Sequence, residues 1–177
     1  LATLELLASQ DREALVRLLV FRSSFTNEMA GAVCGVEATS LHRLVKAALI
    51  MFMRDAKRFT IHPLVRQTVR RHFDLDREVN ANHKHFFLRR LSFISATDPT
   101  VRDAAVNILE PDVDDIFEAW RFAVRTGDID VVMERAHDLR QFCDLAGQRT
   151  EGITLFEMGQ TLFPVSHPDL LAGIAWL

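Results

Sequence analysis

Residues that could carry out chemistry are scattered in this chain and form no known catalytic arrangement. None of the seven glycines is followed by a lysine, whereas a phosphate-binding loop needs glycines that free backbone N–H groups and a lysine beside the phosphates. No serine lies between two glycines at the spacing of a hydrolase nucleophile elbow. We therefore expect this chain to be non-enzymatic.

Histidines near carboxylates could suggest a metal site. His83 and His85 are two positions apart, so on a helix they point to different sides and cannot converge on one ion. Glu134 and His137 share a helix face at the spacing of one half of a di-iron carboxylate site, but the sequence lacks the other half. We predict no metal site and no cofactor for this chain.

A cluster of basic residues between positions 54 and 71 is the one candidate nucleic-acid surface. The helix predicted over residues 39–48 would have to read the bases, and it offers only His42, Arg43 and Lys46. The cluster therefore also fits a solvated or interdomain face. Its members are Arg54, Lys57, Arg58, Arg66, Arg70 and Arg71.

Acidic residues, in contrast, concentrate after position 111. Opposite charges could let the two halves of the chain dock on each other, or they could mark two solvated surfaces. The acidic residues are Asp112, Asp114, Asp115, Glu118, Asp128 and Asp130.

The composition is typical of a folded, soluble protein. The 177 residues carry a net charge of -3, which gives no general attraction to nucleic acid or to anionic membranes. Cys34 and Cys143 are far apart and flanked by apolar residues, so we expect buried, reduced thiols and a cytoplasmic location. No apolar run reaches the roughly 18 residues of a membrane span. The first residue is not methionine and the last segment ends in mid-pattern, which suggests a piece of a longer chain.

Residues 1–75 are predicted to form one domain, beginning with short helices. A first helix covers residues 1–9, and Asp11 can cap the second. Thr26 opens the next helix, which ends at Gly35, and a further helix runs from residue 39 or 40 to residue 48.

A β-hairpin and a further helix complete this domain. Alternating apolar residues predict strands over residues 49–53 and 58–62. Pro63 can occupy the first turn of a helix, because its missing N–H is harmless there. The apolar stripe of that helix is Leu64, Val65, Val69 and Phe73. Short helices followed by a hairpin are the order of a winged-helix domain.

The rest of the chain is predicted to be helical. Residues 76–110 form connecting helices and a linker, with Asp76 as a helix cap and a short helix around residues 101–109. Residues 111–177 carry apolar residues at helical spacing, with turns at Gly127 and Gly147. Thr150 is expected to cap a third helix of this region, and Ser166 to begin a fourth. Short turns make such helices antiparallel neighbours, as in tetratricopeptide-like repeats.

Three segments together resemble one family. Residues 18–26, LLVFRSSFT, are similar to the entry to the winged helix of bacterial signal-transduction ATPases with numerous domains, the STAND class. Residues 58–67, RFTIHPLVRQ, are similar to the segment that leaves the wing in those proteins. Residues 110–152 resemble the start of their tetratricopeptide-like sensor region. The class includes AP-ATPases, NB-ARC-like proteins and regulators of the LuxR and AfsR type.

The resemblance implies a regulatory and protein-interaction segment that acts in signal transduction or transcription regulation. It implies an upstream nucleotide-binding domain in cis, which would hold ADP or ATP, and a protein or small-ligand partner on the helical repeats. In the apoptosis and plant disease-resistance branches, the residue corresponding to His62 is the histidine of a Met-His-Asp motif that contacts the β-phosphate. The resemblance thus implies nucleotide sensing by His62, although Ile61 and Pro63 replace the other two residues of the motif.

Two alternatives stay open at this point. His62 could simply cap the helix that Pro63 begins. The chain could also be a DNA-binding winged-helix transcription regulator with a helical sensor or dimerisation domain.

Overall fold

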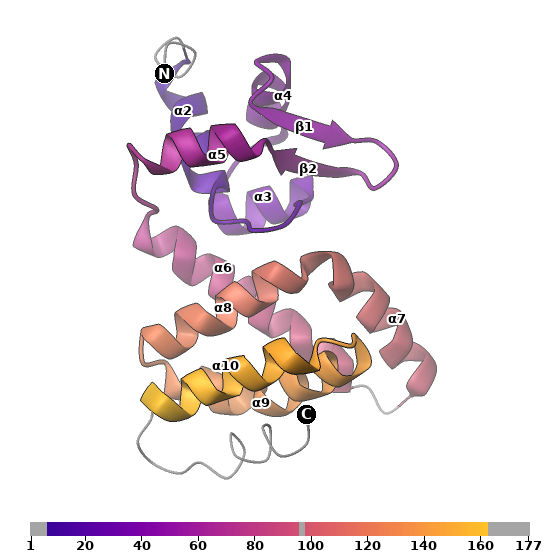
Figure 1. Cartoon of the computed structure of the whole chain (residues 1–177). Helices are drawn as coiled ribbons and strands as arrows, with labels where there is room; N and C mark the ends of the chain where they lie inside the picture. Colours follow the sequence, from indigo (N-terminus) through magenta and orange to yellow (C-terminus); the bar gives the residue numbers. More distant parts are fainter. Residues whose placement is uncertain (1–6, 96–97, 163–177) are drawn as a thin grey trace. The chain divides into compact units, whose positions relative to one another are not determined.

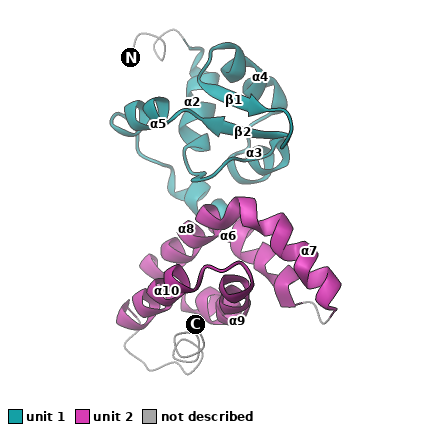
Figure 2. Cartoon of the chain, turned by 45° about the vertical axis from the view of Figure 1, so that its right-hand side comes forward, with its two compact units in different colours: residues 1–83 teal, residues 84–177 magenta. Residues whose placement is uncertain are grey.

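The computed structural model describes residues 7–95 and 98–162 (Figure 1). The described chain is mainly helical and contains one small antiparallel sheet of two strands, which confirms the predicted fold class at this level. The chain divides into two compact units, residues 1–83 and 84–177 (Figure 2). We call them unit 1 and unit 2. The domain borders expected near residues 75 and 110 stay predictions.

Unit 1 contains the short helices and the hairpin in the expected order. Strands β1 and β2 pair antiparallel, with Ile50 opposite Ile61 and Phe52 opposite Phe59. Phe25 adds a backbone bridge to the free edge of β2, since it exchanges two hydrogen bonds of 2.9 and 2.7 Å with Phe59. The elements are α2 (Ser9–Leu18), α3 (Asn27–Cys34), α4 (Ala38–Lys46), β1 (Ile50–Met53), β2 (Arg58–Ile61), α5 (Pro63–Arg70) and the start of α6 (Arg77–Arg90).

Capping residues explain where these helices begin and end. The Thr26 side chain accepts a hydrogen bond from the backbone N–H of Met29 and starts α3, as predicted. Gly35 ends α3 with a φ of 65°, a left-handed conformation that glycine adopts without strain. The prediction for Asp11 is wrong, because α2 begins at Ser9 and Asp11 lies inside its first turn.

The core of unit 1 is built from aliphatic and aromatic side chains of α2, α3, α4 and the segment between α2 and α3. The rings of Phe21 and Phe25 stack with centroids 4.7 Å apart, and both residues are fully buried. Each such side chain contributes about 1.5–3 kcal/mol by leaving water. The other fully buried members include Leu15, Leu18, Leu19, Leu41, Leu44 and Ile50.

Two predicted apolar faces of unit 1 remain in contact with water. In β1 only Ile50 is buried, whereas Phe52 is 44% exposed. In α5 only Val69 is buried. The predicted stripe of this helix is wrong at Leu64, which is 66% exposed, and at Phe73, which is 38% exposed and lies beyond the end of α5. Both surfaces therefore have apolar side chains that the core of unit 1 does not use.

Unit 2 consists of the second part of α6 and the helices that follow. Helices α8, α9 and α10 pack against one another, and Gly127 and Gly147 form the turns between them with φ values of 71° and 68°. Trp120 lies in this core, where its Nε1–H donates to the Leu155 carbonyl at 3.1 Å. The elements are η1 (Leu91–Ser95), α7 (Pro99–Leu109), η2 (Glu110–Asp112), α8 (Val113–Arg125), α9 (Ile129–Leu145) and α10 (Arg149–Leu162).

Helix boundaries in unit 2 depart from the prediction by small amounts. Helix α7 begins at Pro99, because the Asp98 side chain accepts a hydrogen bond from Thr100 N–H at 2.8 Å. Thr150 is not a cap, since α10 already begins at Arg149. The helix predicted from Ser166 and most of the one predicted over residues 1–9 lie outside the described residues. Among the helices described, none has the length and apolar character needed to cross a membrane.

Candidate functional site

His62 lies at the junction between β2 and α5. It is the N-cap residue of α5, its side chain is exposed, and its Nδ1 accepts a hydrogen bond from Leu64 N–H at 3.2 Å. Because this contact uses the lone pair of Nδ1, the ring can donate only through Nε2. The capping role that the sequence left open is therefore present, and the contact with a nucleotide stays a prediction.

The predicted basic surface does not form one continuous patch. Arg58 is buried and its guanidinium donates to both the side chain and the backbone carbonyl of Ser24. Arg66 and Arg70 both donate to the Leu19 carbonyl, at 3.1 and 3.0 Å. Leu19 is the C-cap residue of α2, where the helix dipole favours positive charge. These three arginines thus hold unit 1 together.

Arg43, one of the three polar side chains that the helix predicted over residues 39–48 offered for reading bases, is also engaged within unit 1. Its guanidinium binds both oxygens of the Asp11 carboxylate at 2.8 to 2.9 Å and donates to Ser40 at 2.9 Å. The hydrogen bond from Arg43 is the main reason why the pKa of Asp11 is lowered from its ordinary value. This pair ties α2 to α4.

The Asp11 pair predicts a pH-dependent contribution to stability. A carboxylate with a lowered pKa stabilises the fold above its unfolded pKa of about 4, and this contribution is lost as the pH falls through the folded pKa. We expect Asp11→Asn to lower the melting temperature at pH 7 and to have a shrinking effect below pH 4. Thermal melts of both chains from pH 7 to pH 3 would check this, and an equal effect at every pH would contradict it.

Arg54, Lys57 and Arg71 are the members of the basic cluster that remain exposed. Arg71 lies at the C-terminal end of α5. Arg54 and Lys57 line a groove of about 540 Å³ between the β1–β2 hairpin and the start of α3 and α4. We call it the hairpin groove. The described residues that line it are Asn27, Ala38, His42, Phe52, Arg54, Lys57 and Phe59.

The hairpin groove combines positive charge with an aromatic surface. The rings of Phe52 and Phe59 lie 4.9 Å apart at an angle of 43°. Among the described residues, no aspartate or glutamate lines the groove. The sequence contains one indication of this groove, the large apolar residue Phe52 on a short strand. The convergence of Arg54, Lys57 and His42 depends on the fold and could not be seen in the sequence.

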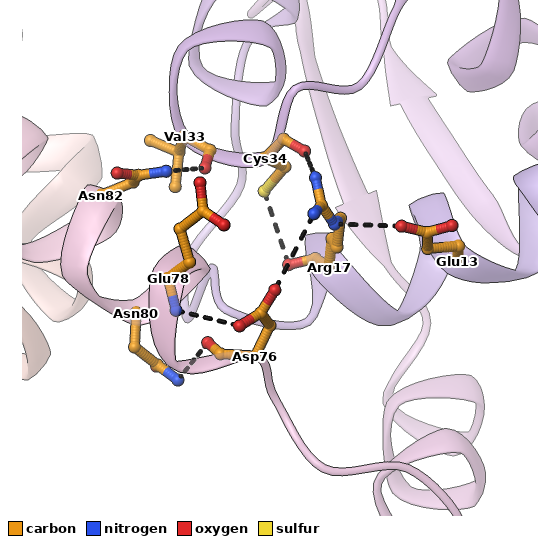
Figure 3. Close-up of polar contacts among 8 residues, drawn as sticks. All are labelled: Glu13, Arg17, Val33, Cys34, Asp76, Glu78, Asn80 and Asn82. Carbon is orange, nitrogen blue, oxygen red and sulfur yellow. Dashed lines mark hydrogen bonds and ion pairs between the residues drawn. The ribbon is translucent and has the colours of Figure 1, made fainter.

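A second polar cluster surrounds Arg17 (Figure 3). The Arg17 guanidinium donates to the Cys34 carbonyl at 2.9 Å, and the Cys34 thiol donates back to the Arg17 carbonyl at 3.4 Å. The same guanidinium lies 3.8 Å from the carboxylate of Asp76, which accepts from Glu78 N–H and so caps the start of α6 as predicted. Arg17 therefore connects α2, the end of α3 and the start of α6. It is a structural cluster, with its polar groups directed at one another.

The acidic residues of unit 2 are divided between its surface, where Asp114 and Asp130 are exposed, and its interior. Asp112 and Asp115 are fully buried. The Asp112 carboxylate lies 3.4 Å from the Arg90 guanidinium, whose carbon is also 5.4 Å from the centre of the Phe86 ring. Asp128 is paired with Lys84, and this hydrogen bond is the main cause of its lowered pKa. Part of the acidic stretch thus belongs to the interior of unit 2.

Unit 2 also has an exposed apolar groove beside η1 and α7. Its volume is about 520 Å³, and Phe93, Val101 and Ile108 along it are each more than half exposed. Clusters of exposed apolar side chains of this kind occur at protein and ligand contact sites.

The histidines and carboxylates considered as metal ligands stay apart. His83 is buried and its ring lies 6.0 Å from that of Phe21, whereas His85 is exposed. Glu134 pairs with Arg135. Within residues 7–95 and 98–162 no three histidine, cysteine, aspartate or glutamate side chains come together as metal ligands.

Both cysteines are free and buried, as predicted. Burial, and to a smaller degree the charge of Glu151, raises the pKa of the Cys143 thiol to about 12. Because the thiolate is the reactive form, we expect the native protein to react with DTNB at pH 8 about a hundredfold or more slower than the protein unfolded in guanidinium. The measurement is absorbance at 412 nm over time. A fast phase of one thiol in the native protein would contradict the prediction, and a Cys143→Ala chain would identify the thiol responsible.

Comparison of the chain with protein-family models, with curated proteins and with solved structures gives no match.

Proposed function

We propose that this chain is a non-catalytic regulatory segment of a signal-transduction ATPase. In this proposal unit 1 is a winged helix that controls an upstream nucleotide-binding module. Unit 2 begins a series of tetratricopeptide-like helical hairpins that receives a protein or small-ligand partner. The protein acts in the cytoplasm and uses ADP or ATP bound by the upstream module.

The observation that carries the proposal is the position of His62. Its side chain is exposed at the N-terminus of α5, directly after β2, in the segment that resembles the family most closely. An imidazole at a helix N-terminus is well placed to donate to an anion, because the helix dipole and free N–H groups favour negative charge there. The order of short helices and hairpin in unit 1 supports the same proposal, as does the exposed apolar groove of unit 2.

Substitution of His62 in the full-length protein tests the proposal. We expect His62→Ala to weaken ADP retention about tenfold, since a hydrogen bond to a charged group contributes about 1.5–3 kcal/mol. The measurements are nucleotide content after purification and the basal ATPase rate. His62→Asn should behave in the same way, although asparagine remains a good N-cap residue.

His72→Ala is the matched control, because His72 is also exposed in unit 1 but lies beyond the end of α5. Unchanged nucleotide retention in both His62 variants would rule out the sensing role. A full-length sequence with no phosphate-binding loop in the few hundred residues before Leu1 would rule out the whole proposal.

DNA binding by unit 1 is the second candidate function, favoured by the exposed Arg54 and Lys57 on the hairpin. It has less support, because Arg43, Arg58, Arg66 and Arg70 all make contacts within unit 1. A gel-shift assay at low salt, where phosphate contacts are strongest, tests it. Absence of a shift with any duplex would exclude it.

A further inference from the structure

The hairpin groove has the properties of a binding site for a negatively charged partner. Arg54 and Lys57 reach it from the hairpin turn, and His42 from the second turn of α4. Ala38 is the first residue of α4, and the side chain of the N-cap residue, Glu37, accepts no capping hydrogen bond from a backbone N–H of the first turn. The N–H groups of this first turn therefore add a partial positive charge at the groove.

No carboxylate among the described lining residues neutralises the positive charge of the groove. Glu37 lines a different groove, which it shares with α2, and its carboxylate accepts a hydrogen bond from the Thr39 hydroxyl at 3.3 Å. Asp55 in the hairpin turn and Glu28 in the first turn of α3 are exposed and do not line the hairpin groove. A bound acidic group would thus meet Arg54, Lys57 and His42 without an acidic competitor among the lining residues that the structure describes.

The hairpin also presents apolar surface at this groove. Phe52 is 44% exposed at the groove, whereas Met51 and Met53, 48% and 38% exposed, lie on the opposite face of β1 and do not line the groove. Large apolar side chains together on one short strand are unusual on a free surface and common at contact sites. Phe52 rests on Phe59, which is only 8% exposed and fixes the position of the outer ring. The partner therefore needs a large apolar side chain beside its negative charge.

The distribution of charge favours a peptide over nucleic acid. A duplex gains affinity from many phosphate contacts along its length. Here Arg58, Arg66 and Arg70 are occupied inside unit 1, so the positive side chains that line the groove are Arg54 and Lys57, both at one end of the hairpin. Such a short basic site next to an aromatic surface matches one or two carboxylates and an apolar side chain.

We propose that the hairpin groove binds an acidic segment of a partner protein, with carboxylates against Arg54 and Lys57 and an aromatic or aliphatic side chain against Phe52. The site requires only unit 1 and does not depend on a nucleotide-binding module. It is therefore independent of the proposed ATPase control.

A display selection tests this inference with the 177-residue chain as bait. The probe is a phage library of random 12-residue peptides, selected at 150 mM salt. The enriched peptides are expected to carry a net negative charge and at least one large apolar residue. Absence of enrichment, or enrichment of neutral or basic peptides, would overturn the proposal. Binding of a 20-base-pair duplex at the same salt in competition with the peptides would overturn it in favour of nucleic acid.

Groove variants then locate the binding of the most enriched peptide, measured by fluorescence anisotropy. Arg54→Glu and Lys57→Glu should each weaken it about tenfold or more, because like charges then face each other in the groove. Phe52→Ala should also weaken peptide binding but leave the salt dependence of the affinity unchanged, because it removes no charge. Arg71→Glu is the matched control, since it makes the same charge change at an exposed arginine outside the groove.

The variants are also expected to remain folded, because all the substituted side chains are exposed. Far-UV circular dichroism and melting temperatures check this directly. Equal affinities in Arg54→Glu, Lys57→Glu and the Arg71→Glu control would overturn the assignment of the peptide to the hairpin groove.

Discussion

A chain with alanine at Trp120 is expected to lose about 3–5 kcal/mol of stability, the usual cost of removing a fully buried large aromatic side chain. Trp120 has no exposed surface, and it joins α8 to α10 through the Phe156 ring, 5.5 Å away, and through its hydrogen bond to Leu155. Since native proteins are stable by only about 5–15 kcal/mol, this loss is a large fraction of the total stability.

The matched variant is Trp120→Phe, which keeps an aromatic ring but removes the indole N–H. We expect it to cost about 1–2 kcal/mol, which is the net value of one hydrogen bond together with a small cavity. Urea unfolding followed by far-UV circular dichroism measures both changes. A Trp120→Ala chain whose unfolding midpoint equals that of the unchanged protein would show that α8 and α10 do not depend on this contact.

Features that depend on neighbouring residues could be predicted from the sequence. Thr26 at the start of α3 and Gly35 at its end were predicted correctly, because a cap acts within one helical turn. Buried Trp120 and the turns at Gly127 and Gly147 also agree with the spacing of apolar residues. In each case the physical cause is contained in a few consecutive positions.

Features that depend on distant residues could not be predicted. The sequence shows Arg58 as one more cation in a basic cluster, but the bridge between Phe25 and Phe59 places it beside Ser24. Aspartate is a residue type that often caps helices, but Asp11 lies inside α2 and its carboxylate binds Arg43, 32 positions later. Charge is visible in a sequence, whereas burial and pairing are decided by the packing of helices.

In the candidate site, too, the features set by neighbouring residues could be predicted and those set by distant residues could not. The position of His62 as the residue before a helix was clear from Pro63, and the structure has it at the N-cap of α5. The hairpin groove was not foreseen, because it draws residues from α3, α4 and both strands. An exposed aromatic residue at Phe52 was its one local sign.

The buried pair of Arg90 and Asp112 gives the second large expected effect. Asp112 is fully buried, and Arg90, with 21% of its side chain exposed, lies 3.4 Å away. Removal of one partner of a buried pair typically costs about 3–5 kcal/mol, because the other charge is left in the interior. We expect Arg90→Met to cost about 3 kcal/mol, at the lower end because part of the arginine already contacts water.

Because a buried charge is the cause, a second substitution should reverse part of the loss. The Arg90→Met/Asp112→Asn chain removes both charges with little change in shape, so it should be more stable than Arg90→Met alone by about 1–2 kcal/mol. Simple loss of packing around the Arg90 stem would instead leave the double variant no better than the single one. The measurement is urea unfolding of the four chains of the cycle at pH 7.

Arg89→Met is the control, since Arg89 is the exposed neighbour in α6 and its substitution should change stability by less than about 0.5 kcal/mol. If Arg90→Met and Arg89→Met proved equally stable, Asp112 would have to be satisfied by groups other than Arg90, and the connection between α6 and the start of α8 would not depend on this ion pair.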